Sequence, residues 1–161
     1  MNSCQSCCGI RRLLICVLAA GWFAGCASPS AVSQSSEPAA DQVLAACMKA
    51  TGARNLLLVE VPAAGNPVAN RLAVLALKVS PSMTAVTLAR LMSAAQRPML
   101  VVYGADTALT VATMESVLDS DAGDFGADRP PVCVAGLSAV HALVVTKARE
   151  LGIALVPVPQ P

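Results

Sequence analysis

Apolar runs alternate with amphipathic segments along most of the chain after residue 36. The runs are continuously apolar, which is typical of strands buried on both faces, and the segments between them have the three-to-four-residue apolar spacing of helices. The predicted strands cover residues 55–61, 71–79, 99–103, 132–135 and 153–158. The predicted helices cover residues 37–52, 81–96, 107–119 and 137–151.

The segment 71–79, "RLAVLALKV", is ambiguous. Asn66-Pro67 could open a helix that runs through it, because proline suits the first helical position. Ser80-Pro81 is also a good helix start, and it would close a preceding strand. We favour the strand and keep the helix as the alternative.

Strands that alternate with helices predict βαβ crossovers and a parallel sheet covered on both faces. We therefore expect residues 37–161 to form a single α/β domain. Its architecture resembles a small three-layer Rossmann-like or flavodoxin-like sandwich with a mostly parallel sheet.

A shorter apolar run stands at the start of the chain. Arg11 and Arg12 precede Leu13–Gly25, an apolar stretch of thirteen residues. This length is typical of the apolar region of a signal peptide, and it falls short of the roughly 20 residues that span a bilayer. Small residues follow, in the order Ala24, Gly25 and Cys26.

These residues resemble the start of a bacterial lipoprotein precursor, in which the cysteine of a lipobox is acylated and becomes the new N-terminus. Ala24-Gly25-Cys26 matches the last three lipobox positions, whereas Phe23 departs from the usual Leu, Val or Ile. The resemblance implies that residues 1–25 are a signal peptide and that Cys26 is lipidated. Ala27 after the cysteine, rather than Asp, implies sorting to the outer membrane.

Three alternatives stay open for this segment. An ordinary signal peptide could be cut after Ala27, since Gly25 and Ala27 are both small. The segment could also be an uncleaved anchor. Arg11-Arg12 weakly suggests a twin-arginine signal. In each case the Ser-, Ala- and Pro-rich residues 26–36 are expected to be a flexible tether.

Composition excludes some function classes. The chain is 55% hydrophobic, 13% charged and 2% aromatic. After Cys26 it carries nine basic and ten acidic residues, a net charge of −1. Because nucleic-acid binding needs phosphate neutralisation and stacking surfaces, we expect no nucleic-acid partner.

Seven cysteines are present, and four of them lie within residues 1–25. "CQSCC" has no second Cys/His pair at matching spacing, so we expect no metal site there. Cys47 and Cys133 remain in the domain, where an oxidising periplasm permits a disulfide. Two buried free cysteines are the alternative.

Ligands of parallel sheets bind at the carboxyl ends of the strands. The predicted strand ends place Ser80, Asp106, Thr107 and Ser138 there, close to helix N-termini that can hold an anion. The alternative is that Ser80, Asp106 and Ser138 are only helix N-caps.

Ser138 and His141 are three residues apart, and His141 is the only histidine. They could act as nucleophile and base of a hydrolase, with Asp106 as the third group. "GLSAVH" lacks the second glycine of a nucleophile elbow, so packing is the favoured role for His141.

No glycine fingerprint for a dinucleotide occurs, and we expect no cofactor. Asp119, Asp121 and Asp124 are partly similar to a calcium loop. Pro130 stands where the bidentate glutamate should be, so we expect a solvated acidic loop.

The expected function is that of a non-enzymatic accessory protein of the bacterial envelope. It would be lipid-anchored facing the periplasm, and would contact another envelope protein through an open sheet edge or the strand-end loops. The alternative is a small-ligand or anion-binding domain that uses those loops.

Overall fold

A computed structural model describes residues 37–94, 97–120, 125 and 129–160. The predicted signal peptide, the lipidated Cys26 and the tether lie outside these residues. So do Asp121 and Asp124 of the acidic loop.

Four parallel strands form one sheet in the order β1-β2-β3-β4. The strands are β1 (Leu56–Val61), β2 (Met99–Gly104), β3 (Val132–Ala135) and β4 (Leu155–Val158). Central strands β2 and β3 are buried along their full length, whereas β1 and β4 form the two edges. The expected α/β class and parallel sheet are confirmed.

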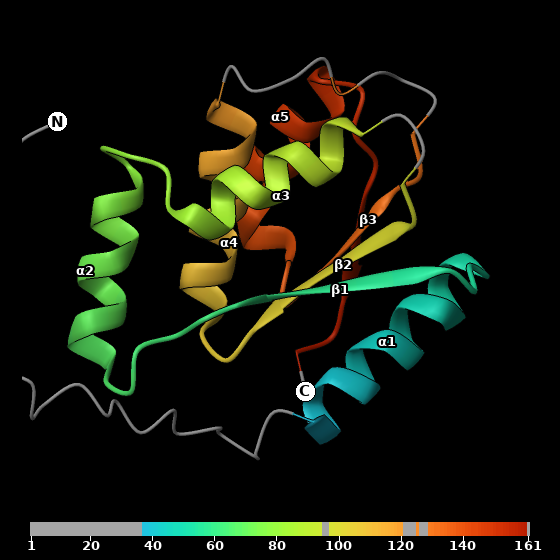
Figure 1. The fold of residues 1–161 in the computed structure, drawn as a ribbon, viewed down its shortest axis with the longest axis horizontal. Helices are drawn as coiled ribbons and strands as arrows, with labels where there is room; N and C mark the ends of the chain where they lie inside the picture. The colour runs from blue at the N-terminus through green and yellow to red at the C-terminus, as the bar shows by residue number, and fades with distance from the viewer. Residues whose placement is uncertain (1–36, 95–96, 121–124, 126–128, 161) are drawn as a thin grey trace, which may run out of the picture. The chain divides into compact units, whose positions relative to one another are not determined.

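Helices cover both faces of the sheet and make three layers (Figure 1). Helix α1 (Glu37–Thr51) packs on one face, where Val43 and Cys47 meet Met99, Val101 and neighbouring strand residues. The larger core lies on the other face. It is covered by α3 (Met83–Ser93), α4 (Thr107–Asp119) and α5 (Ala142–Glu150).

Strand order follows chain order, so the strand sequence does not reverse within the sheet. Rossmann-like and flavodoxin-like sheets bind ligands at the point where strand order reverses and two loops diverge. This sheet therefore places its strand-end loops in a row, without the crevice that a reversal opens.

The strand favoured at residues 71–79 is wrong. Residues Pro67–Leu77 form a helix, α2. The Asn66 side chain accepts a hydrogen bond from the Ala69 amide at 2.8 Å, and Pro67 occupies the first turn. The Asn-Pro start therefore prevails over the strand-like apolar run, because the Asn66 cap and Pro67 stabilise the first turn of a helix.

The other elements agree closely with prediction. Helix α4 and strand β3 have the predicted bounds, and β2 is one residue longer. The predicted helix 137–151 is divided into a 3-10 turn, Ala139–His141, and α5. Ser138 therefore precedes the helical residues rather than lying within them.

Candidate functional site at the carboxyl edge of the sheet

Asp106 is the most connected side chain at the carboxyl edge. Its Oδ1 accepts a hydrogen bond from the Leu109 amide at 2.9 Å and so caps α4. Its Oδ2 accepts from Asn70 Nδ2 at 2.9 Å, and Asn70 Oδ1 accepts from the Ala64 amide at 2.7 Å. Both carboxylate oxygens are therefore used to join α2, α4 and the loop after β1.

Thr107 lies beside the end of β3. Gly136, with φ +74°, would place a Cβ within 2.8 Å of the Thr107 methyl and of Gln160 Oε1. Gln160 Nε2 donates to the Gly104 carbonyl at 2.7 Å, while its buried Oε1 has no hydrogen-bond partner. Thr107 and Gln160 thus fill the space in which a ligand would approach this edge.

Ser80 does not lie at a strand end. It follows α2 and precedes α3, since residues 71–79 are not a strand. Ser82, not Ser80, caps α3, and its Oγ accepts from the Ala85 amide at 3.1 Å. Of the four predicted residues, Asp106, Thr107 and Ser138 therefore follow strands, whereas Ser80 follows α2 and lines a pocket with Val61 at the end of β1.

Ser138 and His141 do contact each other. The Ser138 Oγ lies 3.3 Å from His141 Nδ1, and the Ser138 amide donates to the same nitrogen at 3.2 Å. Asp106 is hydrogen-bonded to Leu109 and Asn70 rather than to His141. The pair therefore forms a turn at the start of α5, in which Asp106 does not orient the histidine as the carboxylate of a catalytic triad does.

A pocket of about 440 Å³ lies beside Ser138, along α5 and edge strand β4. Its lining is mainly apolar, with Leu137, Val145, Leu155 and Pro157, and Arg149 is its charged residue. Such a surface offers few polar groups to fix a small ligand in one orientation.

Asp119 forms an ion pair with Lys147. Within residues 37–94, 97–120, 125 and 129–160, no group of three His, Cys, Asp or Glu side chains is placed to hold a metal ion. In the same ranges, no helix has the length and apolar character needed to cross a membrane.

Two side chains that the sequence analysis does not single out, Asn70 and Gln160, make hydrogen bonds at this edge. Asn70 interrupts the apolar α2 segment on the face that also carries Leu77, and both side chains are buried. A helical interpretation of residues 67–77 would have drawn attention to it. Gln160 gives no local signal, because its partner Gly104 is 56 residues away.

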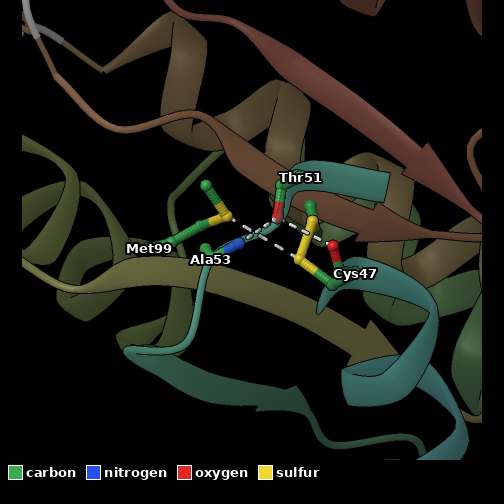
Figure 2. The surroundings of a disulfide bond; sticks show 5 residues. Cys47, Thr51, Ala53 and Met99 are labelled. Carbon is green, nitrogen blue, oxygen red and sulfur yellow. Dashed lines mark hydrogen bonds between the residues drawn. A yellow bond between two sulfur atoms is a disulfide. The ribbon is translucent and has the colours of Figure 1, made fainter. Parts of the chain in front are cut away.

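On the face of the sheet that α1 covers, a disulfide joins Cys47 of α1 to Cys133 of β3, with a Cα–Cα distance of 6.0 Å (Figure 2). Both residues are fully buried, and Cys47 Sγ lies 3.8 Å from Met99 Sδ. Thr51 Oγ1 donates to the Cys47 carbonyl at 2.8 Å in the last turn of α1. The sequence leaves open a disulfide or two free cysteines, and the structure has the disulfide.

Tyr103 lies on the same face as the disulfide, at the end of β2. Burial, followed by the charge of Glu60 and a hydrogen bond to it, raises the pKa of the Tyr103 phenol. Each of these effects favours the neutral phenol.

Comparison of the chain with known protein families, with curated proteins and with solved structures gives no match.

Proposed function

We propose that this protein is a lipid-anchored envelope protein facing the periplasm, which acts by contacting another envelope component rather than by catalysis. Acylation at Cys26 supplies the anchor. Residues 26–36 supply the tether, and residues 37–161 supply the contacting domain.

The Cys47–Cys133 disulfide carries this proposal. Disulfides persist in oxidising compartments, which for a bacterium means outside the cytoplasm. Fully buried sulfurs are also expected to resist reduction once the domain is folded. The bond is therefore consistent with export, which the signal-like residues 11–26 independently predict.

The polar groups at the carboxyl edge support the part of the proposal that excludes catalysis. Asp106 caps α4 and binds Asn70, and Ser138 pairs with His141 in an exposed turn. These contacts satisfy the groups that a small ligand or a substrate would otherwise use. The contacts of Asp106 favour an interaction protein over the ligand-binding alternative, and they keep Asp106 from acting as the third group of a hydrolase centred on Ser138.

Fractionation of cells that produce the chain or a Cys26→Ala variant tests the anchor. We expect the parent protein in the membrane fraction, starting at Cys26 and carrying acyl chains, and the variant without acyl chains and not cut before residue 26. A panel of small anions and metabolites then tests the alternative, since a ligand of the native state raises the melting temperature. A reproducible increase that Asp106→Asn abolishes would favour ligand binding.

A further inference from the structure

Helix α2 has two apolar faces. One of them, with Asn70 and Leu77 at its centre, is buried in the domain, chiefly against α4. The opposite face exposes Val68, Leu72 and Leu75 by 67%, 61% and 58%. Their spacing of four and three residues places them in one row along the helix.

The row continues beyond the helix. Val79, four residues after Leu75, is 89% exposed, and Met83 at the start of α3 is 81% exposed. We refer to Val68, Leu72, Leu75 and Val79 as the α2 stripe. Helices that are apolar all round are normally covered on all sides, and contiguous exposed apolar patches mark interaction surfaces.

Charges beside the stripe indicate what covers it. Arg71 and Lys78 flank it on one side, and no acidic residue occurs between residues 61 and 105. On the side toward α4, Asp106 lines a pocket with Arg71, and Glu115 and Asp119 line a pocket with Lys78. The charged residues within 67–79 themselves are both cations, which favours an anionic occupant over an antiparallel two-fold dimer that would bring the cations of both copies together.

The position of the tether points to a membrane. Helix α1 begins at Glu37, at the carboxyl edge of the sheet, and α2 begins at the same edge after β1 (Figure 1). Residues 26–36 span at most about 40 Å when fully extended. An acylated Cys26 therefore keeps the start of α1, at the same edge as the start of α2, within about 4 nm of the bilayer.

We propose that the α2 stripe is a membrane-contacting surface, which lies on the anionic phospholipid bilayer that anchors the protein. The stripe enters the boundary between headgroups and acyl chains, while Arg71 and Lys78 bind lipid phosphates. The short tether increases the local lipid concentration, so a weak contact suffices. This inference rests on the proposed lipid anchor for its geometry.

Tryptophan fluorescence tests the contact. The single tryptophan, Trp22, lies in the segment that processing at Cys26 removes. We would place a tryptophan at Leu72, and at Leu143 as the matched control, because Leu143 is 85% exposed on α5. Purified proteins are mixed with vesicles of phosphatidylethanolamine and phosphatidylglycerol, with and without brominated acyl chains.

We expect Leu72→Trp to shift its emission to the blue and to be quenched by brominated lipid, while Leu143→Trp stays water-exposed. Absence of a response at Leu72 would overturn the proposal, and equal responses at both sites would overturn its assignment to α2. A shift at Leu72 that depends on protein concentration without vesicles would show self-association instead.

Charge variants test whether Arg71 and Lys78 bind lipid phosphates. Arg71→Gln and Lys78→Gln are each expected to weaken binding of residues 27–161, which carry neither the signal segment nor acyl chains, to these vesicles roughly fivefold at low salt. Lys49→Gln, at an exposed site on α1, is the control and is expected to have little effect. Equal losses for all three would contradict a specific role of the α2 flank.

The two proposals fail in different ways. If Cys26 is not acylated, the anchor is wrong, yet the Leu72→Trp spectrum of residues 27–161, which lack Trp22, still decides whether α2 contacts lipid. If Cys26 is acylated and Leu72→Trp does not respond, the anchor stands and the α2 contact is wrong.

Discussion

Loss of the Cys47–Cys133 disulfide is expected to cost the domain much of its stability. The bond links residues 86 positions apart, and so closes a long loop in the unfolded chain. Chain-entropy estimates for a loop of this length give about 4.6 kcal/mol at 25 °C. Native domains have a total stability of roughly 5–15 kcal/mol, so this loss is a large fraction of it.

The structure also predicts which element opens first when the disulfide is lost. Helix α1 is the element that covers its face of the sheet, and its buried contacts come chiefly from Val43, Cys47 and a few partly buried alanines and leucines. Without the bond, α1 should open before the central strands do. Amides of α1 are then expected to exchange with solvent faster than those of β2 and β3.

Denaturant unfolding is measured for the oxidised protein, for the same protein reduced in denaturant and refolded in dithiothreitol, and for a Cys47→Ala/Cys133→Ala variant. Reduction changes no residue, so it separates the bond from the packing lost in the variant. A decrease of roughly 15–20 °C in the melting temperature should accompany the loss. A loss under about 1 kcal/mol would refute the loop-closure reasoning.

Three further changes test the carboxyl edge and the core. Gly136→Ala should destabilise the fold by about 1–2 kcal/mol more than Gly52→Ala, because both glycines have positive φ but, of the two, only Gly136 has close neighbours. Equal losses of unfolding free energy in chemical denaturation would contradict the close approach of Thr107 and Gln160 to Gly136. Asn70→Ala should cost about 1–3 kcal/mol by removing the partner of the Ala64 amide, and an unchanged unfolding midpoint would show that water replaces it. Tyr103, the only tyrosine, should form phenolate in the folded protein at higher pH than in urea. Its stabilising contribution is present below the unfolded pKa and is lost as pH rises through the raised folded pKa, so Tyr103→Phe should flatten that alkaline loss.

Much of the fold could be predicted because the central elements carry strong local signals. Strands β2 and β3 are buried on both faces, so their sequences are apolar without interruption, and Asp106 marks the start of α4 as its cap. Helix α2 was assigned wrongly for a related reason. Apolar residues occupy both its buried and its exposed face, so the segment has the continuously apolar sequence that is typical of a buried strand.

The edge contacts could not be predicted in the same way. The bond from Asn70 to Asp106 needs α2 to be a helix packed on α4, and the bond from Gln160 to Gly104 needs the strand order. The disulfide needs α1 to cross β3. Each depends on tertiary placement, which local periodicity does not encode.

The intact mass of the protein purified from the membrane fraction, beside a Cys26→Ala variant, tests the central claim most directly. The account predicts a chain that begins at an acylated Cys26 and carries the Cys47–Cys133 bond, with the acyl mass lost in the variant. An unmodified chain that starts near Ser28, or an intact chain that starts at Met1, would contradict it.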